Sequence, residues 1–222
     1  MKYAFLLIIL IIIGFIWHSR QSINVTGSDL PAEASAKARP IQQAAIYNQI
    51  KPMHFPEILE PPISEFSSRI TKKPFGIYIT PETSPVQPDR WTGYHTGVDI
   101  EYEDILYDVP VRAIADGEIV LNKFATGYGG VVVIRHNISG QDILALYGHL
   151  NPQSLPSKSV KEVKQGQVIG ILGDGYTEET DGARKHLHFS LIKKDALDIR
   201  GYVKTQEELA DWYDPEEFYM TK

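Results

Sequence analysis

Apolar residues recur between positions 109 and 192 in short runs that are interrupted by turn residues. Asp116-Gly117, residues 137–140 and Gln165-Gly166 separate several of these runs. Short runs rich in β-branched residues and spaced by turn signals are typical of antiparallel hairpins rather than of alternating strands and helices. We therefore predict a mainly β domain with an antiparallel β-sandwich or open-barrel-like core. The predicted strands cover residues 109–115, 118–121, 131–136, 143–147, 168–172 and 186–192.

The N-terminal segment has a different pattern. Residues 3–17 carry no charge, and eleven of these fifteen residues are Leu, Ile or Phe. Insertion of those eleven side chains into a bilayer is favourable by roughly 3–7 kcal/mol. A helix of this length spans about 22 Å, which is less than the ~30 Å hydrocarbon core. No small-residue cleavage site follows, so we predict a transmembrane signal anchor over residues 1–20 rather than a cleaved signal peptide.

The next segment separates this anchor from the β-rich region. Residues 18–40 are rich in Ser, Ala, Gly and Pro, and several prolines between positions 52 and 62 disfavour regular structure. We predict a flexible Pro- and Ala-rich tether over residues 21–63, with a short helix over residues 41–50. The folded domain is predicted to cover residues 64–222. Within it, residues 80–91 contain three prolines and should form a long loop.

Composition excludes several classes of function. The chain has 222 residues, a formal net charge of -6 and no basic cluster, which argues against nucleic acid as a partner. It contains no cysteine, which excludes disulfides, cysteine-ligated metal sites and a lipid anchor attached through cysteine. A domain outside the cytoplasm can lack disulfides if its core is large enough.

Two histidine motifs carry the candidate chemistry. His95 and Asp99 stand four residues apart in His-Thr-Gly-Val-Asp, and His186 and His188 flank one residue in His-Leu-His. Zinc binds His nitrogen and Asp oxygen, and catalytic zinc sites use three protein ligands and leave one position open. The residue types therefore suit one zinc ion, provided that the two motifs meet in space.

Local conformation decides whether they can meet. His186 and His188 lie on a predicted strand, where residues two apart face the same side at a spacing of roughly 6.5 Å. A straight strand would separate His95 from Asp99 by roughly 13 Å, which is too far for one ion. Gly97 and its β-branched neighbours argue against a helix. We therefore predict a bend or bulge at Gly97 that brings the two side chains together.

A third motif, Tyr147-Gly-His149, ends the run 143–147. A histidine after a flexible glycine at the end of a buried strand is a candidate for holding an attacking water or stabilising an oxyanion. Any one histidine alone is more commonly a structural hydrogen-bonding group, and we interpret His136 in this way. The three motifs together, each beside glycine and apolar strand residues, favour a metal site.

From residue 75 to residue 215, about two-thirds of the chain, the sequence resembles the lysostaphin/LytM-type zinc metallopeptidases, which cut peptidoglycan peptides. The resemblance rests on these motifs and on segments that hold no metal ligand: residues 110–120, 127–130 and 166–170. The segment Phe75-Gly-Ile-Tyr-Ile79, where the family often has an arginine, and the stretch before His186 border the substrate groove of such enzymes. That stretch, which in the family usually contains small residues and Gly-Pro, reads Asp181-Gly-Ala-Arg-Lys185 here. Loops beside a site often carry specificity, so Arg90 and Trp91 in the predicted loop at residues 80–91, and Tyr94 just after it, are the candidate groove residues.

The resemblance implies a role for each candidate residue. His95, Asp99 and His188 would bind one Zn²⁺, and His149 and His186 would be the catalytic histidines. All five positions hold the expected residue type, unlike inactive relatives of the same fold that have lost ligands. The implied protein is a zinc endopeptidase that hydrolyses peptide bonds in peptidoglycan cross-links or bridges. Together with the predicted anchor, this makes it a single-pass bacterial membrane protein with its catalytic domain on the extracytoplasmic side. The alternatives are a non-catalytic module that binds the wall or regulates another hydrolase, and a protease for secreted proteins or peptides.

Overall fold

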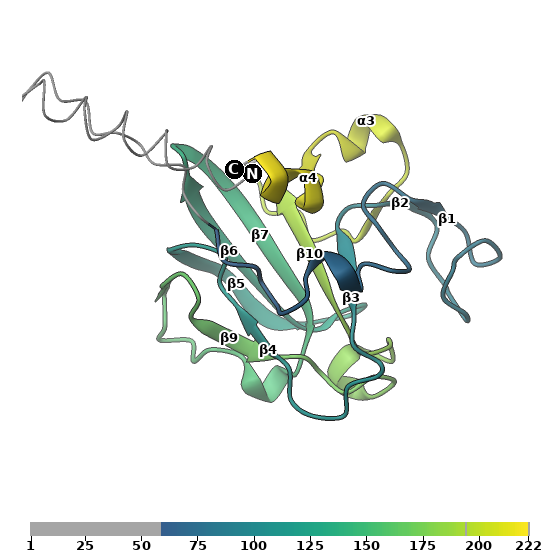
Figure 1. Ribbon diagram of the computed structural model, residues 1–222, viewed down its shortest axis with the longest axis horizontal. Coiled ribbons are helices and arrows are strands. Elements are labelled where there is room, and N and C mark those ends of the chain that lie inside the picture. Colours follow the sequence, from purple (N-terminus) through teal and green to yellow (C-terminus); the bar gives the residue numbers. More distant parts are fainter. Residues whose placement is uncertain (1–58, 194, 222) are drawn as a thin grey trace, which may run out of the picture. The chain divides into compact units, whose positions relative to one another are not determined.

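The large sheet of the domain has seven antiparallel strands (Figure 1). The computed structural model describes residues 59–193 and 195–221. Along the main path the strand order is β12-β10-β7-β6-β5-β8, and β3 pairs with β10 outside that path. The strands of this sheet are β3 (Val98–Glu101), β5 (Gly117–Ala125), β6 (Gly129–Ile138), β7 (Gln141–Leu150), β8 (Glu162–Val163), β10 (His186–Ile192) and β12 (Trp212–Tyr213).

Two small antiparallel sheets and a few short helices complete the described part of the chain. One small sheet has the order β1-β2-β11, and the other pairs β4 with β9. Their strands are β1 (Tyr78–Ile79), β2 (Gly93–His95), β11 (Tyr202–Val203), β4 (Pro110–Arg112) and β9 (Val168–Ile171). The helices are η1 (Ser67–Arg69), η2 (Pro152–Ser154), η3 (Glu178–Thr180), α3 (Gln206–Leu209) and α4 (Pro215–Thr221).

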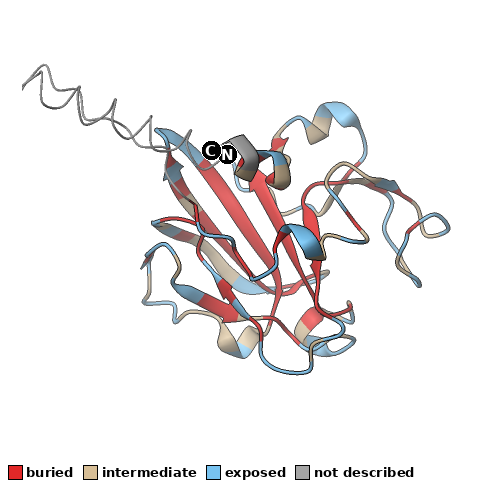
Figure 2. Ribbon diagram, in the orientation of Figure 1, coloured by how far each residue is buried: buried red, intermediate tan, exposed pale blue. Residues whose placement is uncertain are grey.

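Both faces of the large sheet are buried at its centre, where β6, β7 and β10 are almost entirely covered (Figure 2). Successive side chains of a strand point to opposite faces. Accordingly Val132 and Ile134 belong to one apolar cluster, while Val131 and Val133 belong to a second. This double burial explains why the sequence shows continuous apolar runs here instead of a strict alternation of apolar and polar residues.

The prediction of a mainly β, antiparallel domain is confirmed, and so are several local features. Ser139 and Gly140 join β6 to β7 with left-handed φ values of 53° and 82°, as a tight hairpin turn requires. Residues 80–92 form the predicted loop between β1 and β2. In addition to these predicted features, the Thr205 hydroxyl accepts a hydrogen bond from the Glu208 amide at 3.2 Å and caps α3.

The N-terminal predictions fall largely outside the described residues. This applies to the anchor at 1–20, the short helix at 41–50 and all but the last five residues of the tether at 21–63. Those last residues are packed: Leu59 and Ile63 are buried in the core, so the domain includes residues ahead of the predicted boundary at 64. None of the helices in the described residues is both long enough and apolar enough to cross a membrane.

The predicted bend at Gly97 is present. Residues 96 and 97 form a bend between β2 and β3, and the chain passes there from the small β1-β2-β11 sheet to the large sheet. Consequently His95 Nε2 and Asp99 Oδ1 lie only 3.2 Å apart. The bend also packs against β10 so closely that a β-carbon on Gly97 would meet the Phe189 carbonyl oxygen at 2.3 Å. Only glycine fits this contact without a backbone shift.

The substitution Gly97→Ala should therefore destabilise the domain. Relief of the contact with Phe189 requires the bend and β10 to move apart, and overpacking of this kind costs roughly 1–3 kcal/mol. Chemical denaturation of the purified protein measures this loss. Gly140→Asn is the control, because no atom lies within 4 Å of the position and Asn tolerates left-handed backbone. Equal stability of Gly97→Ala and wild type would contradict this account of the bend.

Candidate metal centre

Strand pairing brings the separate motifs together. In the pairing of β3 with β10, Asp99 lies opposite His188 and Glu101 lies opposite His186. On the other side of β10, His188 lies opposite Gly148, which immediately precedes His149. His95 reaches the same place from β2 through the bend at Gly97. All five residues predicted from the sequence therefore surround one point.

Three donor atoms form a tight triangle at this point. His95 Nε2 lies 3.0 Å from His188 Nδ1, His188 Nδ1 lies 3.0 Å from Asp99 Oδ1, and Asp99 Oδ1 lies 3.2 Å from His95 Nε2. All three side chains are buried. Among the described residues these three form the group of His, Asp and Glu side chains whose atoms converge closely enough to hold one metal ion.

Hydrogen bonds at the far side of each imidazole determine which nitrogen faces the triangle. His95 Nδ1 lies 3.1 Å from the carbonyl oxygen of Pro74. A carbonyl only accepts, so Nδ1 carries the proton and the lone pair of Nε2 faces inward. His188 Nε2 lies 2.9 Å from the Ser190 hydroxyl, which can accept its proton and leave Nδ1 free. Such outer contacts fix the tautomer of a metal-binding histidine.

The donor set fits zinc. Four donors placed tetrahedrally at bond lengths of 2.0–2.1 Å are about 3.3 Å from one another, close to the separations in the triangle. Burial lowers the pKa of His188, so its ring is neutral and can act as a ligand. Burial alone would raise the pKa of Asp99, but it is held well below its usual range, with the Arg184 guanidinium 2.9 Å from Oδ2 as a positively charged neighbour. Two imidazoles and one carboxylate are an accepted zinc ligand set.

His149 and His186 stand beside the triangle. Their ring centroids lie 4.1 Å apart, and His186 Nε2 lies 3.5 Å from Asp99 Oδ2. His186 Nδ1 donates to the Arg184 carbonyl at 2.8 Å, so Nε2 carries the free lone pair. Burial lowers the pKa of His149 to about 3 and that of His186 well below its usual range, which leaves both rings neutral.

The backbone of His149 has a left-handed conformation, with φ of 62°. This is uncommon for a residue with a β-carbon and is often found at functional sites. In addition, Nδ1 of this histidine is buried and has no hydrogen-bond partner among the described residues. The Tyr128 hydroxyl is also buried without a hydrogen-bond partner among the described residues, and the Tyr128 ring centroid lies 5.4 Å from that of His188. Both polar groups line the cavity described next.

A cavity of about 620 Å³ opens onto the site. Two loops, residues 80–92 and 174–183, contribute to its walls. They are joined by an ion pair of 2.9 Å between Arg90 and Asp181, whose carboxylate also accepts from the Gly127 amide. Trp91 stacks on Tyr202 with 6.2 Å between ring centroids. Of the predicted groove residues, Arg90 and Trp91 line the cavity, whereas Tyr94 packs its ring 4.9 Å from Tyr78.

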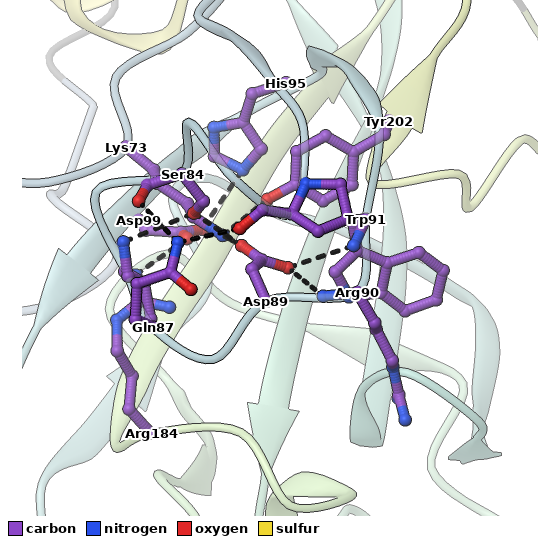
Figure 3. Close-up of polar contacts among 12 residues, drawn as sticks. Lys73, Ser84, Gln87, Asp89, Arg90, Trp91, His95, Asp99, Arg184 and Tyr202 are labelled. Carbon is purple, nitrogen blue, oxygen red and sulfur yellow. Dashed lines mark hydrogen bonds and ion pairs between the residues drawn. The ribbon is translucent and has the colours of Figure 1, made fainter.

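Sequence reasoning missed a buried ion pair in the wall of this cavity (Figure 3). Lys73 Nζ lies 2.6 Å from Asp89 Oδ2 and 2.9 Å from the Tyr202 hydroxyl. The same carboxylate accepts a hydrogen bond from the Ser84 hydroxyl at 2.6 Å. These contacts hold the loop 80–92 over the ligands, and the Lys73 carbonyl also accepts from the Asp99 amide. Isolated Lys and Asp residues in a loop give no sequence signal for such a pair.

Part of the chain is similar to a known peptidase family. Residues 93–199 match the model of peptidase family M23. The DD-carboxypeptidase/endopeptidase Mpg of Neisseria meningitidis is 38% identical over 95 residues, which are 43% of this chain and 19% of the relative. The murein hydrolase activator EnvC of Escherichia coli is 37% identical over 84 residues, 38% of this chain and 17% of the relative.

A solved structure of LytU aligns with 68% of this chain and 83% of its own, at 26% identity and a TM-score of 0.44. The chain spans about a fifth of the length of the curated relatives that it matches. Its residues 93–199 are similar to the peptidase domains of family M23, the lysostaphin/LytM type. Family M23 contains zinc metallopeptidases and also members without catalytic activity.

The Lys73–Asp89 pair should make stability depend on pH. Burial opposes ionisation of Asp89, but Lys73 and Ser84 outweigh it and lower its pKa below the usual 3.8. A carboxylate whose pKa is lower in the folded state stabilises the protein above its unfolded pKa, and this contribution is lost as the pH falls through its folded pKa. We expect Asp89→Asn to reduce the unfolding free energy at pH 7 by roughly 3 kcal/mol, since Asn keeps only part of the hydrogen bonding.

The difference between Asp89→Asn and wild type should begin to shrink below about pH 4, where the unfolded carboxyl group takes up a proton, and should shrink further as the pH falls towards the lower folded pKa. Denaturation curves between pH 3 and pH 7, recorded with a chelator present, measure it without any contribution from metal binding. A difference that stays constant over this range would refute the assignment to the Asp89 charge.

Proposed function

We propose that this protein is a zinc-dependent endopeptidase that hydrolyses peptide bonds in peptidoglycan cross-links or bridges. The observation that carries the proposal is the complete set of five residues: three converging donors and two neutral imidazoles beside them, of which all but His95 line a cavity of about 620 Å³. The similarity to family M23 supports a peptidase. The relative Mpg, named as a carboxypeptidase and endopeptidase, supports a peptide substrate of this class.

The ligands in this proposal are His95 Nε2, Asp99 Oδ1 and His188 Nδ1. Zinc held by such a set acts as a Lewis acid towards a carbonyl group and lowers the pKa of water towards 7. The loops at residues 80–92 and 174–183 would enclose the substrate and reduce its contact with water.

His149 and His186 supply the proton transfers. His186 Nε2 carries a free lone pair, and His149 Nδ1 has no hydrogen-bond partner among the described residues. Either nitrogen can therefore accept a proton from the attacking water. The protonated ring then donates to the developing oxyanion or to the leaving amine. Low imidazole pKa values in the resting state keep both rings ready to accept.

We further propose that residues 1–20 anchor the protein in the bacterial cell membrane as a single span and that residues 64–222 act on the extracytoplasmic side. The apolar run at residues 3–17 supports the anchor. Peptidoglycan lies outside the cytoplasmic membrane, so a peptidase that acts on it has to be placed there.

A second candidate function is regulation of another wall hydrolase. The relative EnvC is named as a murein hydrolase activator, which favours this reading. The two functions differ in what the site must do, because a regulator needs neither a bound metal nor the two neutral imidazoles.

His149→Ala should separate the two functions. His149 does not contribute to the triangle of donors, so the variant should keep one zinc ion per chain. Turnover of cross-linked muropeptides should fall by about 10²–10⁴-fold, because a proton-transfer group is lost. Elemental analysis of the purified full-length chain measures the zinc content, and mass spectrometry of the released fragments measures the turnover.

His188→Ala is the matched variant in the same cluster and should lose zinc and turnover together. A wild-type chain that contains zinc but cleaves no wall preparation would contradict the proposed peptidase function. If His149→Ala then retained the full effect on cell walls, the regulatory function would replace it.

A further inference from the structure

A buried arginine contacts the metal-binding carboxylate. Arg184 Nη2 lies 2.9 Å from Asp99 Oδ2, on the side of the carboxylate away from the triangle. The same guanidinium donates to both oxygens of Glu101, with Nη2 2.5 Å from Oε1 and Nε 2.8 Å from Oε2. Figure 3 shows Arg184 reaching Asp99 from below. All three side chains are buried.

The strand pattern explains how these residues meet. Asp99 and Glu101 are two apart on β3, so their side chains lie on one face. Arg184 precedes His186 and His188 at the same spacing of two, just before β10 begins. Because β3 and β10 pair with Asp99 opposite His188 and Glu101 opposite His186, the alternation places the guanidinium beside both carboxylates.

We propose that Arg184, held by Glu101, is a positioning residue that fixes Asp99 as a zinc ligand through one oxygen only. This inference rests on the proposed zinc site. The guanidinium occupies Oδ2, and Oδ1 is thereby directed towards His95 Nε2 and His188 Nδ1. With Oδ2 engaged, the carboxylate cannot turn to offer both oxygens to the ion, so a coordination position stays open for substrate or water.

The side chain has to be arginine for this role. A guanidinium is planar and presents several N–H groups in a fixed fork, so it can bind Glu101 with two bonds and Asp99 with a third. A lysine ammonium is a point charge on a flexible stem and does not impose this geometry. Arg184 is also the nearest positive charge to two buried carboxylates on one strand, and it balances one of them before the metal arrives.

The backbone and the side chain of Arg184 contact different residues of the site, His186 and Asp99 respectively. The carbonyl oxygen of Arg184 accepts from His186 Nδ1 at 2.8 Å, and a side-chain substitution leaves that contact in place. Changes at the guanidinium therefore report on Asp99 and not on the orientation of His186.

The test is zinc affinity of the full-length chain, measured by competition with a chromophoric chelator, for wild type, Arg184→Ala and Arg184→Lys. Loss of an outer contact to a metal ligand typically weakens binding by about 10–100-fold. We expect Arg184→Ala to fall in this range. Arg184→Lys keeps the positive charge, so the metal-free protein should stay folded. Its zinc affinity should fall by about tenfold because the guanidinium fork is absent.

Cobalt(II) substitution gives a second readout that a purely structural role would not change. Its absorption spectrum depends on the number and arrangement of donors, so both Arg184 variants should differ from wild type when fully loaded. Arg69→Ala is the matched control: Arg69 also bonds two carboxylates, Glu65 and Asp104, and the Glu101 carbonyl, but not Asp99. It should keep wild-type zinc affinity and the wild-type cobalt spectrum.

Wild-type zinc affinity and an unchanged cobalt spectrum in both Arg184 variants would overturn the inference while the zinc site stands. A wild-type chain that binds no zinc would overturn the proposed function itself, and this inference with it. Weaker zinc binding and an altered spectrum in the Arg184 variants, with Arg69→Ala unchanged, supports the positioning role.

Discussion

The convergence of three buried lone pairs on one point is the constraint on which the rest of the site depends. His95 Nε2, His188 Nδ1 and Asp99 Oδ1 approach one another to 3.0–3.2 Å, and all three side chains are buried. Outer hydrogen bonds to the Pro74 carbonyl and the Ser190 hydroxyl direct protons away from this point. A cation between these electron-rich atoms would offset their mutual repulsion.

The fold provides this convergence by combining two sheets. Neither sheet holds all three donors: β2 carries His95, while β3 and β10 carry Asp99 and His188. The bend at Gly97 connects the two, and the contact of that glycine with the Phe189 carbonyl fixes the distance between them. The double burial of β6, β7 and β10 gives the large sheet the rigidity that a metal site needs.

Much of this could be predicted from the sequence, because it depends on local patterns. The short apolar runs predicted the strands, and the spacing of His186 and His188 placed both side chains on one face. Residues that act through long-range packing were not predictable. Glu101 lies two positions after the predicted ligand Asp99, and Arg184 lies two positions before the catalytic candidate His186. Their pairing nevertheless requires the register of β3 with β10. The loop 80–92 was predicted as a loop, but its attachment through Lys73 and Asp89 depends on the folded arrangement.

The measurement that tests the central claim most directly is anomalous X-ray diffraction at the zinc edge from crystals grown with zinc. We predict one strong anomalous peak bonded to His95 Nε2, Asp99 Oδ1 and His188 Nδ1, with His149 and His186 close by but not bonded. A zinc ion bound by other residues, or crystals in which these three side chains point apart with no peak between them, would contradict the account.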